Sequence, residues 1–215
     1  MSLLPPDDEL DLIHTRQYEA RVYQISDDEL LVRGVVSDQK PPGLYLVDDP
    51  EPMELHQMQL ELRVAIPKLE ITHAQVVFET HPNSKCPLIA GDYEKLVGLS
   101  IVRGFTRKIR DLFGGPKGCT HTNALLQAMA PAVIQAMWSV SVRAGRGLSG
   151  GQDSNDKNDK EARERRIAGT LNTCHIWAED GEHVAAIRRG DRSDYPPIPV
   201  RERLRELGRD ETSWE

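Results

Sequence analysis

One stretch of the chain, residues 55–66, alternates between apolar and polar side chains. The residues on its apolar face are Met58, Leu60, Leu62, Val64 and Ile66. Successive side chains of a strand point to opposite faces, so this pattern predicts a strand with one buried and one solvated face. His56 falls on the apolar face by parity. A chain with such a strand must cover its apolar face with other elements.

Three neighbouring segments carry the same kind of pattern. Residues 13–25, 30–36 and 69–80 are predicted strands, joined by a turn at 26–29 and another at 67–68. Residues 39–52 are rich in Pro and Asp and are expected to form a loop with an extended insert at 44–47. Four successive strands with mostly short connections predict an antiparallel meander with one face buried.

Helical and hairpin patterns follow the strands. Residues 89–97, 104–113 and 122–142 are predicted helices, and Pro131 is expected to kink or split the last one near Ala130. Residues 173–178 and 183–187 are predicted strands joined by an Asp180-Gly181 hairpin turn. The expected fold class is therefore α+β, with an antiparallel β-meander packed against three helices and a C-terminal β-hairpin after a flexible linker.

The polar segments define the expected domain organisation. Residues 1–12 are an acidic N-terminal tail, residues 13–188 are a single α+β domain, and residues 189–215 are a polar C-terminal tail. Within the domain, residues 143–168 are the predicted flexible linker, because they contain several glycines and the polar run 152–160 without apolar periodicity.

Charge and cysteine usage exclude several classes of protein. The net charge is −7 at pH 7, which argues against a nucleic-acid partner. No run of about 18 apolar residues and no secretory signal are present, so we expect no membrane partner and a cytoplasmic location. The 3 cysteines do not indicate a disulfide framework. A small-molecule ligand remains compatible with this composition, and the sequence sets no oligomeric state.

A glycine-rich run, residues 114–118, directly precedes Cys119 and His121 at the start of the last predicted helix. The run has no evident packing role, which favours a functional interpretation. We expect Thr122 to be the N-cap, because both side chains then lie in the preceding loop and can converge on one point. With Thr120 as the N-cap they would diverge around the helix.

The first hypothesis for these residues is a metal site. Cys119 and His121 supply two ligands, Cys174 or His175 a third, and His14 or His56 a fourth. Thiolate and imidazole ligands suit zinc best and iron second. The site would serve a metabolic, catabolic reaction directly or as an accessory, and the metal is expected to be lost on Cys119→Ser.

Two other hypotheses remain open. In the second, the chain is a metal-free enzyme whose catalytic residues are Cys119 as thiolate nucleophile and His121 as base, acting in acyl transfer or thioester cleavage. In the third, it is a non-enzymatic interaction module. A structural role is favoured for four further residues, Cys86, His56, His73 and His183.

Several separated segments together resemble one family. They are His14-Thr15-Arg16, the Tyr93–Gly98 segment, Gly114-Gly115, Gly118-Cys119-Thr120-His121, Cys174-His175 and Asp180-Gly181. In these residues the chain resembles the bacterial domain-of-unknown-function family 2889, from Ile13 to Ala186. The resemblance implies a single domain and carries no activity with it.

Overall fold

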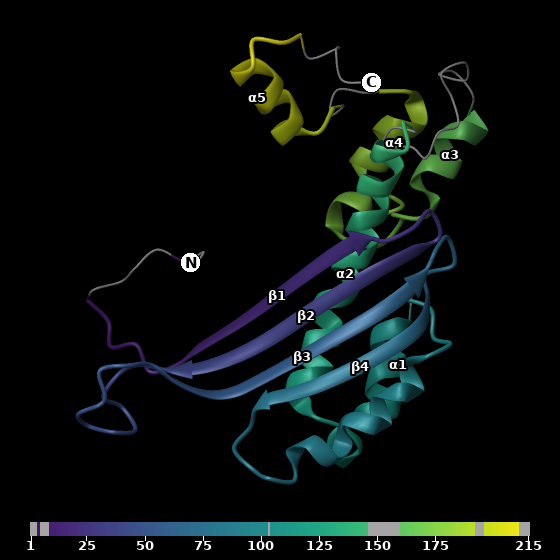
Figure 1. Cartoon of the computed structure of the whole chain (residues 1–215). Coiled ribbons are helices and arrows are strands. Elements are labelled where there is room, and N and C mark those ends of the chain that lie inside the picture. Colours follow the sequence, from purple (N-terminus) through teal and green to yellow (C-terminus); the bar gives the residue numbers. More distant parts are fainter. Residues whose placement is uncertain (1–3, 5–8, 103, 146–159, 192–195, 211–215) are drawn as a thin grey trace. The chain divides into compact units, whose positions relative to one another are not determined.

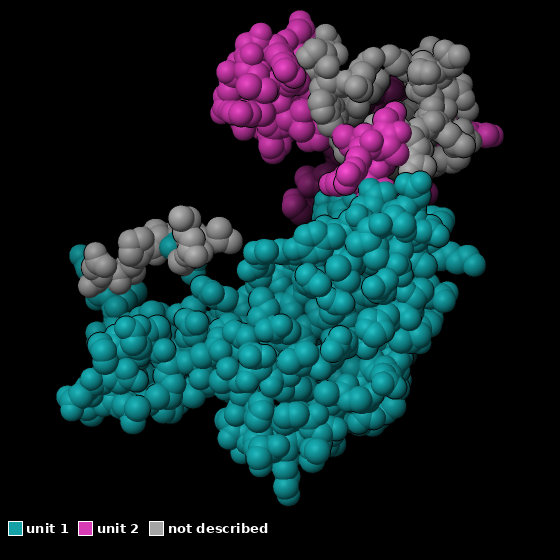
Figure 2. Space-filling model, in the orientation of Figure 1, with its two compact units in different colours: residues 1–137 teal, residues 138–215 magenta. Residues whose placement is uncertain are grey.

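The computed structural model describes Leu4 and residues 9–102, 104–145, 160–191 and 196–210. It divides into two compact units, residues 1–137 and residues 138–215, which are coloured separately in Figure 2. The boundary falls inside the longest helix. The domain boundaries inferred from the sequence stay predictions.

The first unit is built on a four-stranded antiparallel sheet. Its strands are β1 (Thr15–Gln24), β2 (Glu29–Lys40), β3 (Met53–Ala65) and β4 (Glu70–Thr80), in the order β1-β2-β3-β4 (Figure 1). The predicted meander is confirmed. β2 is longer than expected and extends to Lys40, whereas the insert predicted at 44–47 consists of turns and bends.

Two helices cover one face of this sheet, α1 (Phe105–Phe113) and α2 (Thr120–Arg143) (Figure 1). The 3-10 helices η1 (Cys86–Leu96) and η2 (Gly115–Lys117) precede and follow α1. A Cβ atom on Gly34 would lie 3.1 Å from Leu125 Cδ1 and would clash with Met129 Sδ. The missing side chain on β2 therefore lets α2 approach the sheet closely, which positions the first turns of α2.

The N-cap predicted for the long helix is wrong, and the helix is not split at Pro131; the alternative of a kink there stays a prediction. α2 begins at Thr120, and the Asn123 amide donates to the Cys119 carbonyl at 2.9 Å, so the helical hydrogen bonds start at Cys119. Thr122 is fully buried within the first turn. α2 also continues through Pro131, because the loss of one hydrogen bond is offset by buried neighbours on both sides, Met129 and Val133.

α2 is long and apolar enough to cross a membrane by composition, and 28% of its most apolar window is buried. Core helices of soluble proteins meet the same criterion, and the face of α2 that carries Leu125 and Met129 packs on the sheet. The criterion is therefore weak support for a membrane span.

The second unit is helical where it is described. It contains α3 (Lys160–Ala168), η3 (His175–Trp177), α4 (Glu182–Arg189) and α5 (Ile198–Glu206). The C-terminal hairpin is therefore a wrong prediction, and the described residues hold five α-helices rather than three helices. Gly181 precedes the first turn of α4 instead of closing a turn between strands. Arg188 on α4 forms two hydrogen bonds to Glu164 on α3, at 2.8 and 3.2 Å, which favours the helical pairing.

Parts of the expected linker and tails lie outside the described residues. These parts are residues 1–3, 5–8, 146–159, 192–195 and 211–215. Residues 160–168, which the sequence placed in the flexible linker, form α3. Within the expected C-terminal tail, residues 198–206 form α5.

Candidate metal centre

A buried carboxylate, Asp38, lies near the end of β2 on the face that the helices cover. It continues the buried series Leu30, Val32, Gly34 and Val36, and its side chain is 3% exposed. The Arg16 guanidinium on β1 donates to both carboxylate oxygens of Asp38, with Nε 2.5 Å from Oδ1 and Nη2 2.6 Å from Oδ2. This guanidinium, more than any other neighbour, lowers the pKa of Asp38 to about 2. Asp38 is therefore ionised at neutral pH.

Three histidines from separate parts of the chain surround the same carboxylate. His56 Nδ1 on β3 lies 3.2 Å from Asp38 Oδ2, and His121 Nε2 on α2 lies 3.1 Å from that oxygen. His14, just before β1, places Nε2 3.4 Å from Oδ1. The rings of His56 and His121 are stacked with centroids 4.0 Å apart. Residues far apart in the sequence thus converge on one carboxylate.

The register of the sheet explains how Asp38 and His56 meet. They are direct cross-strand partners on β2 and β3, and the register then shifts so that Gln39 pairs with Glu54. The shift is a β-bulge at Leu55, a feature that is common beside functional sites. It interrupts the regular ladder immediately beside the Asp38 and His56 pair, and the pairing then continues to Lys40 and Met53.

The protonation state of His121 suits a metal ligand, and His56 offers a buried ring nitrogen. Burial lowers the pKa of His121, and the neighbouring His56 and Arg16 lower it further, so the neutral imidazole is favoured. His56 Nδ1 is buried and, although close to Asp38 Oδ2, lies off the hydrogen-bond direction, so among the described residues it has no hydrogen-bond partner. A buried ring nitrogen without such a partner is unusual unless another species binds it.

Cys119 lies on the other edge of the His121 ring. Its Sγ is 3.8 Å from His121 Nδ1, whereas Nε2 of the same ring faces Asp38. The two ring nitrogens of an imidazole point away from each other, so an ion held by Nε2 together with Asp38 would lie on the opposite side of the ring from Cys119. Cys119 instead contacts the outer edge of this histidine.

The start of α2 is anchored by a tyrosine on η1. The Cys119 amide donates to Tyr93 Oη at 2.9 Å, and the Tyr93 hydroxyl donates to Asn123 Oδ1 at 3.0 Å. Burial raises the pKa of Tyr93 to about 12, so the hydroxyl stays protonated and can donate. Asn123 in turn donates to the Phe113 carbonyl at 2.6 Å. These bonds fix the backbone that carries His121.

The glycine-rich run has a packing role, which corrects the interpretation made from sequence. A Cβ atom on Gly118 would lie 2.5 Å from the Phe113 carbonyl oxygen and 2.7 Å from Phe113 Cβ. A Cβ on Gly114 would clash with the Arg110 carbonyl. Only glycine lets the chain fold back against the end of α1 before it enters α2.

Gly118→Ala is therefore expected to lower the free energy of unfolding by about 1–3 kcal/mol, because the backbone at Phe113 must shift. Urea unfolding of the variant measures this loss. Gly91→Ala is the matched control, since nothing lies within 4 Å of a Cβ there. Equal stability of the two variants would contradict the packing role.

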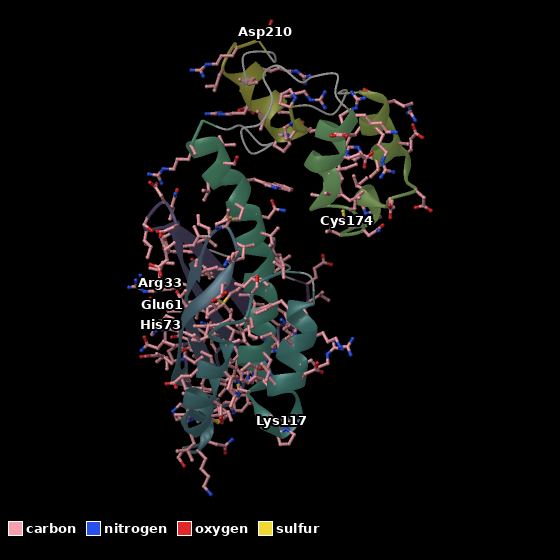
Figure 3. The ribbon with its side chains drawn as sticks, turned by 90° about the vertical axis from the view of Figure 1, so that its right-hand side faces the viewer. Arg33, Glu61, His73, Lys117, Cys174 and Asp210 are labelled. Atoms are coloured by element: carbon pink, nitrogen blue, oxygen red, sulfur yellow. The ribbon has the colours of Figure 1, made fainter. Side chains whose placement is uncertain are left out.

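The structure brings together part of the residue set predicted from sequence. His14 and His121 contact Asp38, and Cys119 contacts the opposite edge of the His121 ring. Cys174 and His175 are exposed residues of the second unit (Figure 3 labels Cys174). The ligand assignment of that set remains a prediction.

The central residue, Asp38, was missed from the sequence. The predicted strand ended at Val36, although Asp38 continues the buried parity of Leu30 and Val32. A charged residue on the apolar side of a strand is the signal that could have found it.

The comparisons with known proteins identify the family. The sequence model described as "Protein of unknown function (DUF2889)" matches residues 14–135, more than half of the chain. The chain belongs to the DUF2889 family. The matched part includes every residue around Asp38 and ends within α2, so Cys174 and His175 lie beyond it. No curated protein and no solved structure matches the chain.

Proposed function

We propose that this DUF2889 chain binds a transition-metal ion, zinc or ferrous iron, through Asp38, His56 and His121. The ion would serve a metabolic reaction on a small molecule. The observation that carries the proposal is the convergence of one ligand atom from each residue, all within 4.8 Å of one another. The three free cysteines support a reducing, cytoplasmic setting.

Two of the three separations between the ligand atoms are close to those around a metal ion. Bonds from zinc to nitrogen or oxygen are about 2.0–2.2 Å long, which puts two ligand atoms of a tetrahedral ion about 3.3–3.5 Å apart. Asp38 Oδ2 lies 3.1 Å from His121 Nε2 and 3.2 Å from His56 Nδ1. The third pair, His56 Nδ1 and His121 Nε2, lies within 4.8 Å, and the two stacked rings would turn toward each other to admit the ion. The ion would then satisfy the unpartnered nitrogen of His56.

Arg16 is compatible with this assignment. A carboxylate offers about four lone-pair directions, and a bidentate guanidinium occupies two of them. The guanidinium orients Asp38, as partners of metal-binding carboxylates commonly do. It holds the carboxylate with one oxygen, Oδ2, facing His56 and His121.

The ligand types restrict the metal. Two imidazoles and one carboxylate occur in catalytic zinc sites, which keep a fourth position for water, and in non-haem ferrous sites. His14 stands at the edge of the group, 3.4 Å from Asp38 Oδ1, and is a candidate for a further ligand. Either metal would supply Lewis-acid chemistry at the open position.

Metal analysis of the untagged full chain tests the proposal. We expect about one equivalent of zinc or iron by plasma mass spectrometry, and a loss of at least about tenfold in affinity in His56→Gln and His121→Gln, since each removes one ligand. His73→Gln is the matched control, because His73 is exposed on the sheet face away from the helices (Figure 3). Cys119→Ser is expected to retain the metal, unlike in the first hypothesis from sequence. A folded wild-type chain that binds neither metal would refute the proposal.

One observation favours a second candidate, a metal-free thiol enzyme. Cys119 Sγ, His121 and Asp38 form a chain of contacts at 3.8 and 3.1 Å, in the order nucleophile, base and orienting acid. This candidate predicts that iodoacetamide alkylates Cys119 of the metal-free chain faster than Cys86, which has similar burial. His121→Gln should remove the difference. Equal rates in the wild-type chain would exclude it.

A further inference from the structure

The groups around Asp38 differ in exposure in an ordered way. The side chain of Asp38 is 3% exposed, those of His121 and His56 are 16% and 22% exposed, and those of His14 and Arg16 are 37% and 38% exposed. Asp38 is therefore the most buried member of the group, and His14 and Arg16 form its most exposed side, which we call the mouth of the site.

The charges of the site do not balance once a divalent ion is bound. Asp38 contributes one negative charge and Arg16 one positive charge, and their bidentate contact pairs the two. The histidine ligands are neutral when they bind a metal. The two positive charges of the ion would thus have no counter-charge among these residues. An open coordination position in such a site favours an anionic ligand, because a nearby opposite charge stabilises it.

Two apolar segments border the mouth. Leu12 and Ile13 lead directly into His14 and are exposed, and the β2–β3 loop carries the exposed side chains of Leu44 to Val47. Both segments lie at the same end of the sheet (Figure 1). Lys40, two residues after Asp38, places Nζ 5.8 Å from the centre of the Tyr45 ring in this loop. Large apolar side chains beside a polar centre are typical of sites for small organic ligands.

We propose that the metal centre takes an organic anion of the carboxylate class with an apolar body. The carboxylate occupies the open coordination position beside Arg16, and the apolar body lies against the segments that border the mouth. This inference rests on the metal centre proposed above and names the class of ligand for that site.

Cobalt(II) is a suitable probe, because its visible absorption reports both its binding to the full chain and changes in its coordination. Benzoate and acetate are then titrated into the cobalt-loaded protein. We expect benzoate to change the spectrum saturably and to bind at least about tenfold more tightly than acetate, as burial of an aromatic ring implies. Equal affinities for the two anions would overturn the apolar part of the inference.

Arg16→Gln tests the electrostatic part. The variant keeps all proposed ligands but loses the group that orients Asp38, so it is compared with the wild-type chain at saturating cobalt. There it should lose about tenfold in benzoate affinity, since Asp38 then offsets part of the charge of the ion. Arg16→Lys keeps the charge and should lose less, and circular dichroism verifies the fold of both. Arg33→Gln is the matched control, because Arg33 pairs with Glu61 on the opposite face of the sheet (Figure 3). Unchanged benzoate affinity in Arg16→Gln overturns the inference.

The two proposals fail in different ways. A wild-type chain that does not bind cobalt refutes the metal centre and the anion site together. If the chain binds cobalt but its spectrum does not respond to benzoate or acetate, the proposed metal centre stands and the proposed anion site is refuted.

Discussion

Asp38→Asn is expected to abolish metal binding and to lower the free energy of unfolding by about 2–3 kcal/mol. The carboxylate is the only acidic member of the candidate ligand group, and an amide oxygen is a poor ligand for zinc or iron. Its pKa, lowered from 3.8 to about 2, shows that the folded protein stabilises the charged form. A difference of about two pKa units corresponds to about 2.5 kcal/mol. Asparagine keeps the shape of the side chain but leaves Arg16 without its counter-ion.

Urea unfolding at about pH 7 with a chelator measures the stability loss separately from metal binding. Glu61→Gln makes the same carboxylate-to-amide change at an exposed pair, where Glu61 accepts from Arg33 at 2.7 Å. Exposed pairs contribute about 0–1 kcal/mol, so this control should change little. Similar stability of the two variants would show that the buried contact with Arg16 does not hold the fold.

The sheet could be predicted because its burial pattern is local. β3 alternates along almost its whole length, and β4 follows after a short turn, so parity alone identifies the buried face. The region after residue 160 lacks such a pattern. There the Asp180-Gly181 dipeptide, a common hairpin signal, precedes α4, whose Arg188 contacts Glu164. The dipeptide does not by itself specify a hairpin, because the same glycine serves as the N-cap residue of α4.

The candidate site was only partly predictable, because it depends on contacts between distant elements. Cys119 and His121 were identified from their spacing, but nothing in their spacing relates them to Asp38 on β2. These residues meet because the register of β2 with β3 places Asp38 opposite His56, and because α2 approaches the sheet closely at Gly34. The sequence does show that Asp38 is a charged residue in line with the apolar positions of the strand. It was missed because the strand was ended at Val36.

Acidification is expected to destabilise the metal-free chain in two separate pH ranges. The pKa of His121 is lowered in the folded state, mainly by burial, so the folded protein favours the neutral ring. Its contribution to stability is present above the unfolded pKa of about 6.5 and is lost as the pH falls through the lower folded pKa. Asp38 contributes above its unfolded pKa, and this contribution is lost as the pH falls from about 3.8 towards about 2. Both effects have the same sign, since in each case the unfolded chain binds more protons.

The titratable and charged groups that face Asp38 and His121 are Arg16, His14, His56 and Cys119. Variants of Asp38 and of His121 should each remove one of the two pH ranges. His121→Gln should flatten the decline that begins below about pH 6.5, and Asp38→Asn should flatten the one below about pH 3.8. His73→Gln should retain both, because His73 is exposed on the other face of the sheet. Urea unfolding across this pH range, with a chelator present, measures the three profiles. If all three variants followed the wild-type profile, the acid sensitivity would arise outside this site, and the buried Asp38 and His121 would not be the groups that couple folding to proton uptake.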